Sequence, residues 1–135
     1  MSFMENIDNF INNPGEHASN PDYNAMKETL IYMKKNALGA KNIVSTEKII
    51  THLNSKGYEM SREYWQISIL GYLRDNGIFI VSKIPKGMFL INSEKDAQEA
   101  YTSMLNRVAS ETKRLILFED MAKESGYTLY REITV

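Results

Sequence analysis

Four glycines divide this chain into segments with a helical pattern, and their order constrains the fold more than any other feature. Gly39, Gly57, Gly77 and Gly126 each follow a stretch whose apolar residues recur at helical spacing. Glycine just past the last helical residue is a common helix terminator. Capping residues precede the same stretches, namely Asn20-Pro21, Ser45, Ser61 and the run Ser93-Glu94-Lys95-Asp96. The pattern predicts helices over about 21–38, 45–56, 61–76 and 94–125.

The first three predicted helices each carry a stripe that we expect to be buried. Residues three and four apart share one helix face. The stripes are Met26, Leu30 and Met33 in the first helix, Ile49, Ile50 and Leu53 in the second, and Gln66, Ile69, Leu70 and Leu73 in the third.

A β-hairpin is predicted between the third and the last helix. Two β-like runs, 78–82 and 88–91, flank a connection that contains Pro85-Lys86-Gly87. Residues 41–44 are long enough only for a small strand or an extended link. Three helices followed by a hairpin are typical of the winged-helix variant of helix-turn-helix. The predicted fold class is therefore mainly α with a small β-hairpin: a winged helix-turn-helix plus a long C-terminal helix.

This order divides the chain into four parts. We expect an acidic N-terminal arm over 1–20, a winged-helix domain over 21–93, a long C-terminal helix over 94–125 and a C-terminal tail over 126–135. Partial alternation after Gly126 predicts a terminal strand in the tail. In the arm, Phe3, Ile7 and Phe10 fall at helical spacing, so a short amphipathic segment could dock on the body or on a partner.

Composition excludes several classes of chemistry. The chain has no cysteine, so disulfides and thiolate metal sites cannot form. His17 and His52, the two histidines, lack a second ligand at a recognised metal spacing. We find no nucleophile elbow and no glycine-rich phosphate loop. We therefore expect a cytoplasmic protein that is not an enzyme, with no metal, no cofactor and no membrane segment.

Charge is distributed unevenly along the chain. The net charge is −1, yet residues 1–22 hold four acidic and no Lys or Arg residues. Residues 41–92 hold seven basic and four acidic residues, a net +3. A mildly basic middle gives modest support for a nucleic-acid-binding face.

The run of residues from Ser61 to Leu115 resembles a family of small winged-helix proteins encoded by phages and prophages. The matching residues are Tyr72-Leu73-Arg74, Gly77, Ile80, Lys86-Gly87, Phe89 and the helix start Asn92-Ser93-Glu94-Lys95-Asp96. The resemblance covers about Ser45 to Leu115. It implies a DNA-binding component of phage or prophage transcription or replication control. The chain departs from the family pattern at Ile67 and Gly71, where family members usually have basic or polar residues.

The candidate DNA-binding residues lie on the third helix and the hairpin. The N-terminal part of a recognition helix meets base edges in the major groove, and Arg and Gln are common base readers. Lysines at a hairpin tip or a helix start contact phosphates. The predicted site is Lys48, Arg62, Glu63, Tyr64, Gln66, Lys83 and Lys86. The alternatives are an ordinary solvated helix face and lysines that only keep an edge strand soluble.

A second function class stays open at this point. Tyr64, Ile67 and Gly71 could form a partly apolar surface for a protein partner, as in a phage inhibitor of a host protein. Trp65 and Tyr72 could stack on bases, but aromatic residues on such a helix more often pack in a core.

The long helix carries a stripe that predicts a homodimer. Tyr101, Val108, Leu115 and Ala122 recur every seven residues. The second row of the same seam holds Ala97, Met104, Phe118 and, between the last two, Glu111. We expect dimerisation through Tyr101, Met104, Val108, Leu115 and Phe118, in an antiparallel or crossed arrangement because Glu111 interrupts the seam. The alternatives are that the helix folds back onto the body, or that the acidic arm with Phe3, Ile7 and Phe10 covers the seam.

Overall fold

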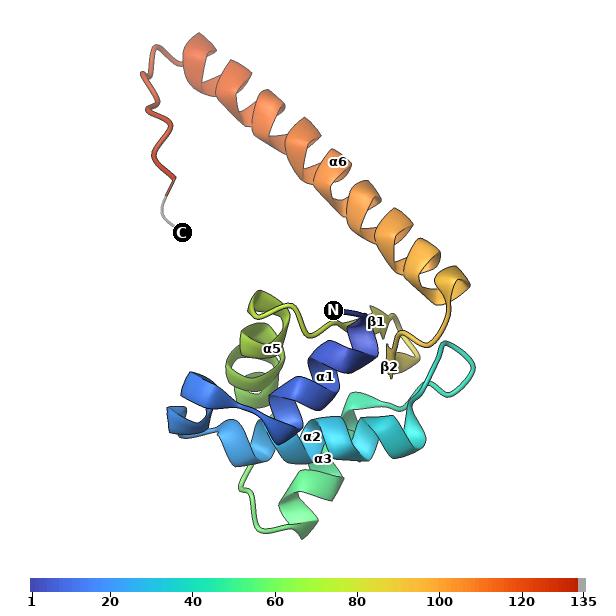
Figure 1. Cartoon of the computed structure of the whole chain (residues 1–135). Coiled ribbons are helices and arrows are strands. Elements are labelled where there is room, and N and C mark those ends of the chain that lie inside the picture. The colour runs from blue at the N-terminus through green and yellow to red at the C-terminus, as the bar shows by residue number, and fades with distance from the viewer. Residues whose placement is uncertain (134–135) are drawn as a thin grey trace. The chain divides into compact units, whose positions relative to one another are not determined.

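The structure is a computed structural model that describes residues 1–133 (Figure 1). The chain forms two compact units, Met1–Ala97 and Gln98–Val135. It is mainly helical, with one small hairpin and a long C-terminal helix. In chain order the elements are α1 (Phe3–Asn12), η1 (Gly15–Ser19), α2 (Tyr23–Asn36), α3 (Thr46–Ser55), α4 (Arg62–Tyr64), η2 (Trp65–Leu70), α5 (Gly71–Asp75), β1 (Ile80–Lys83), β2 (Gly87–Leu90) and α6 (Glu94–Glu124).

The predicted apolar stripes form the core of the first unit. Met26, Leu30 and Met33 on α2 are fully buried, and Ile49 and Leu53 on α3 pack against them. Burial of apolar surface of this kind is the main stabilising term in folding. The stripes predicted for the first two helices are confirmed, with Ile50 partly rather than fully buried.

The third helix is continuous over 62–75 but is not uniformly α-helical. Ser61 caps it through its hydroxyl, which accepts the Tyr64 amide at 3.1 Å. Trp65–Leu70 then forms a π-helical turn, in which the Gly71 amide donates to the Gln66 carbonyl. One extra residue in a turn changes which side chains face the core. Trp65 is therefore fully buried, and the prediction that Gln66 lies in the buried stripe is wrong because Gln66 is exposed.

The predicted hairpin is confirmed. β1 and β2 are antiparallel, with Ile80 opposite Leu90 and Lys83 opposite Gly87. The expected short strand before α3 contributes only a bridge between Val44 and Met88. A second bridge joins Leu38 to Leu90, so β2 is paired on both sides. This pairing ties the hairpin to the segment between α2 and α3.

The N-terminal segment is part of the first unit. Ile7 and Phe10 of α1 are buried in the same core as α2 and α3. The Tyr23 hydroxyl donates to the Phe10 carbonyl at 2.7 Å and to the Ile11 carbonyl at 3.1 Å. The sequence left open whether this amphipathic segment docks on the body or on a partner. In the structure it packs on the body, beside α2 (Figure 1).

The first long helix begins slightly later than the sequence predicts. The first long helix was expected to begin at Pro21, yet α2 begins at Tyr23. The Asn20 side chain accepts the Asp22 amide at 2.8 Å, and the Tyr23 amide donates to the Asn20 carbonyl. This turn delays the start of the helix.

Helix α6 begins and ends where the sequence predicts. The Ser93 hydroxyl accepts the Asp96 amide at 3.1 Å, as in a capping box. The Gly126 amide closes the last turn on the Lys123 carbonyl. The predicted terminal strand is wrong over 127–133, which has no strand partner among the described residues; Thr134 and Val135 lie outside them. Across the part of the chain described, no helix combines the length and apolar character needed to cross a membrane.

Candidate nucleic-acid interface

The first turn of the helix over 62–75 is exposed, as a recognition helix requires. Arg62, Glu63, Tyr64 and Gln66 all reach solvent from this turn. Lys48 is exposed in the first turn of α3. These five predicted residues therefore stand at the N-terminal ends of two consecutive helices.

Two carboxylates contact this group. Arg62 Nη1 donates to Glu47 Oε1 at 2.6 Å, which joins the start of α4 to the start of α3. Both side chains are more than half exposed, at 60% and 66%. An exposed ion pair contributes only about 0–1 kcal/mol, so Arg62 can exchange Glu47 for another anion.

Tyr64 contacts the second of these carboxylates, that of Asp22. Its hydroxyl donates to Asp22 Oδ2 at 2.7 Å. This hydrogen bond, with smaller effects of burial and of the Asp22 charge, raises the pKa of the Tyr64 phenol above its ordinary value. No local pattern points to Asp22 as a partner, because 42 positions separate it from Tyr64. Glu47 was visible only as a favourable charge at a helix N-terminus.

The hairpin turn is the second exposed part of the predicted site. Lys83 and Lys86 are exposed at the ends of the turn. Ile84, between them, has 90% of its surface exposed. No acidic residue occurs from Ile78 to Ile91, so the hairpin carries a local charge of +2.

Arg74 connects the hairpin to the helix over 62–75. Its guanidinium donates to the Ile80 carbonyl at 3.0 and 2.7 Å and to the Ser82 hydroxyl at 2.9 Å. Five fixed donors make Arg suited to such a multiple contact. The sequence marked Arg74 only as part of a motif, and its positioning role depends on the fold. The helix and β1 are thus joined by a hydrogen-bonded side chain as well as by the chain itself.

Two aromatic residues are not available for stacking on a base. Trp65 is fully buried, and its indole Nε1 donates to the Thr29 hydroxyl at 3.3 Å. Tyr72 is partly buried, with its hydroxyl 2.6 Å from His17 Nδ1. The interpretation of Trp65 as a core residue is confirmed.

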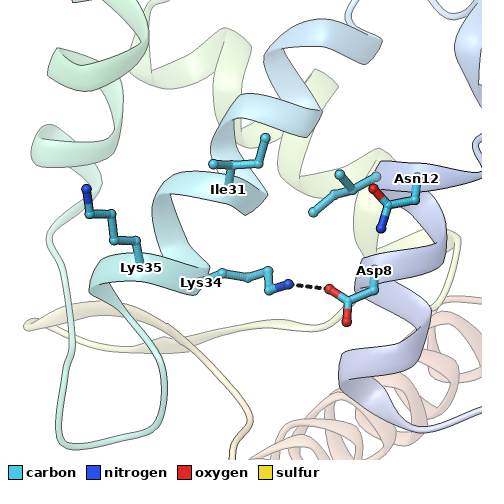
Figure 2. Close-up of a pocket in the computed structure, with 6 residues that line it drawn as sticks. Asp8, Asn12, Ile31, Lys34 and Lys35 are labelled. Atoms are coloured by element: carbon cyan, nitrogen blue, oxygen red, sulfur yellow. Dashed lines mark hydrogen bonds and ion pairs between the residues drawn. The ribbon is translucent and has the colours of Figure 1, made fainter.

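A shallow, open pocket lies apart from the predicted residues. It has a volume of about 350 Å³ and is lined by Asp8, Ile11, Asn12, Ile31, Lys34 and Lys35, from α1 and α2. Figure 2 shows Lys34 pointing toward Asp8, with which it forms an ion pair. Since Lys34 is already paired with Asp8, this pocket adds little to the candidate interface. Among residues 1–133, no three histidine or carboxylate side chains gather in a way that could hold a metal ion.

The residues predicted to dimerise lie together on one helix. All five side chains, Tyr101, Met104, Val108, Leu115 and Phe118, are exposed on α6.

Comparison of the chain with models of protein families, with curated proteins and with solved structures found no match.

Proposed function

We propose that Met1–Ala97 is a winged-helix domain that binds double-stranded DNA, with the helix over 62–75 in the major groove and the hairpin on the backbone. What supports this is the link made by Arg74, which holds the positively charged hairpin against the helix whose first turn is exposed. Base contacts by Arg62 and Gln66 would then be positioned by phosphate contacts from Lys48, Lys83 and Lys86. A role in phage or prophage transcription or replication control is the part of this proposal that rests on the family resemblance.

The experiment is a salt titration of binding to random-sequence duplex DNA. Each phosphate contact lowers the logarithm of the binding constant by about 0.9 per decade of salt. The double variant Lys83→Ala/Lys86→Ala should therefore reduce the salt slope by about 2. The matched control, Lys35→Ala/Lys113→Ala, removes two exposed lysines from other surfaces and should leave the slope unchanged. No binding of the native chain at low salt would rule out the proposal.

A second candidate function is supported by the other residues of the same helix. Ile67 has 69% of its surface exposed and Tyr64 45%. Arg62 and Tyr64 are both engaged by carboxylates, which repel DNA phosphates. An exposed apolar surface of this kind fits a protein partner, as in an inhibitor of a host protein.

One substitution separates the two candidates. Ile67→Arg adds a cation to the helix face, so it should strengthen DNA binding if that face meets DNA. If the face instead binds a protein, Ile67→Arg should release that partner, whereas Ile84→Arg on the hairpin turn should retain it. The second candidate is favoured only if the native chain also fails to bind DNA.

A further inference from the structure

Helix α6 carries an apolar seam that is exposed to solvent and interrupted at one position. Tyr101, Met104, Val108, Leu115 and Phe118 each have between 48% and 66% of their surface exposed. They follow the alternating three- and four-residue spacing of a coiled-coil seam, broken once at Glu111. Leu105 and Met121 are exposed beside it. Soluble proteins rarely leave such a contiguous apolar surface without a partner.

The seam is long enough for a stable helix pair. From Tyr101 to Phe118 its exposed part extends for about 26 Å at 1.5 Å per residue. A stable interface buries about 800 Å² on each partner. The two aromatic side chains, 57% and 66% exposed, can still bury about 90–160 Å² each, and the aliphatic side chains of the seam, with Leu105 and Met121 beside it, add to this area. A second copy of α6 offers the same length and the same apolar character.

Charge decides the direction of the pairing. In a parallel pair, Glu111 would face the partner's Glu111 in the middle of the seam, and like charges at such close range are strongly unfavourable. In an antiparallel pair the two glutamates lie on opposite sides of the centre. Arginines are available for them, because Arg107 and Arg114 lie on the same flank of the helix. Arg114 Nη1 already donates to Glu111 Oε1 at 2.7 Å.

We propose that α6 forms an antiparallel pair with α6 of a second copy, about a two-fold axis between Ala109 and Ser110. In this register Tyr101 faces the partner's Phe118, and Met104 faces the partner's Leu115. Val108 faces the partner's Glu111, whose carboxylate then lies next to Arg107. Every facing pair joins one residue from each row of the seam, as antiparallel coiled coils do.

This pairing leaves no carboxylate of the seam without a cation. Each Glu111 lies between Arg114 of its own helix and the partner's Arg107. The proposal concerns α6 alone and does not depend on DNA binding, so either can fail without the other.

The first test is the mass of the full chain in solution at tens of micromolar. The native chain should be dimeric, and Leu115→Glu should weaken the dimer by at least about a hundredfold because it places a charge in the apolar seam. Ile116→Glu is the matched control, since Ile116 is equally exposed on the next position but lies outside the seam. It should remain dimeric. A monomeric native chain, including one in which α6 folds back on its own domain, overturns the proposal, as does a dimer that Leu115→Glu leaves intact.

The second test addresses the direction of the helices. Arg107→Glu and Glu111→Arg should each weaken the dimer by about tenfold, because each brings like charges together across the interface. The double variant restores opposite charges and should return to within about threefold of the native affinity. Lys113→Glu, on the outer face of α6, is the control and should have no effect. A double variant that stays as weak as the single ones contradicts the antiparallel register.

Cross-linking gives an independent readout of the same register. The chain has no cysteine, so single cysteines can be placed without background. Met104→Cys mixed with Leu115→Cys should form a mixed disulfide dimer under oxidising conditions. If each variant instead forms a disulfide only with a second copy of itself, and no mixed product appears, the helices are parallel and the proposal is overturned.

Discussion

At the scale of single residues, Gly87 shows how closely two backbone segments meet behind the hairpin. Val44 and Met88 exchange backbone hydrogen bonds of 3.0 and 2.7 Å. A Cβ atom on Gly87 would lie 2.0 Å from the Val44 carbonyl oxygen, and its φ of +141° is rarely adopted by other residues. Only glycine therefore allows β2 to pair with this segment.

Gly87→Ala should lower the free energy of unfolding by more than about 3 kcal/mol, because the Val44 backbone must move to admit the methyl group. Gly57→Ala is the matched control. Gly57 also has a positive φ, +94°, but nothing lies within 4 Å of its added Cβ. It should lose only about 1–2 kcal/mol. Urea unfolding of both variants measures the difference, and equal losses would contradict the close approach.

The hydrogen bond between Tyr64 and Asp22 makes a prediction about pH. Asp22→Asn removes the negative acceptor and should return the pKa of the Tyr64 phenol toward its ordinary value. Because the folded-state pKa is raised, the contribution of this bond to stability is fully present below the unfolded pKa. It is lost as the pH rises through the folded value. NMR titration of labelled tyrosine checks the shift; an unchanged pKa in Asp22→Asn would assign it to another cause.

At the scale of the elements, α1 contributes to the core although its sequence is short and acidic. Its buried face consists of Ile7 and Phe10, and its C-terminal carbonyls accept the hydroxyl of Tyr23. Asn6 Nδ2 also donates to the Gly77 carbonyl at 2.8 Å, which joins α1 to the end of the third helix. The helix is therefore a structural element of the first unit.

Ile7→Ala should destabilise the protein by about 2–4 kcal/mol, the usual cost of a large-to-small substitution in a core. Ile84→Ala, at an isoleucine with 90% of its surface exposed, should change stability by less than about 0.5 kcal/mol. Denaturant unfolding monitored by circular dichroism measures both. A neutral Ile7→Ala would mean that α1 is dispensable, as a free arm would be.

At the scale of the whole molecule, the main core cluster draws its buried residues from Ile7 to Leu90. This range lies entirely within Met1–Ala97. The start of α6 closes the unit: the Asp96 carboxylate accepts the Asn92 amide at 3.0 Å and the Ala40 amide at 3.4 Å. Among the described residues, this cluster includes none after Leu90.

A chain of residues 1–97 should therefore fold by itself, with a midpoint of thermal unfolding within about 5 °C of that of the full chain. A chain of residues 1–92 is the control. It lacks Asp96, so two amides lose their acceptor and a larger decrease is expected. Thermal unfolding followed by circular dichroism compares the three chains. An unfolded 1–97 chain would show that the core depends on α6.

The sequence by itself determined the order of the helices and the hairpin from α2 to α6, because caps, glycine stops and apolar spacing act over a few residues. It predicted Trp65 as a core residue, the hairpin, and the seam on α6. The tertiary structure alone decided what those elements contact. The π turn that exposes Gln66, the burial of Ile7 and Phe10, the carboxylates beside Arg62 and Tyr64, and the hydrogen bonds of Arg74 to β1 all depend on packing. Tertiary packing brings together groups whose separation along the chain carries no local signal, and it can override local propensity where more apolar surface is buried.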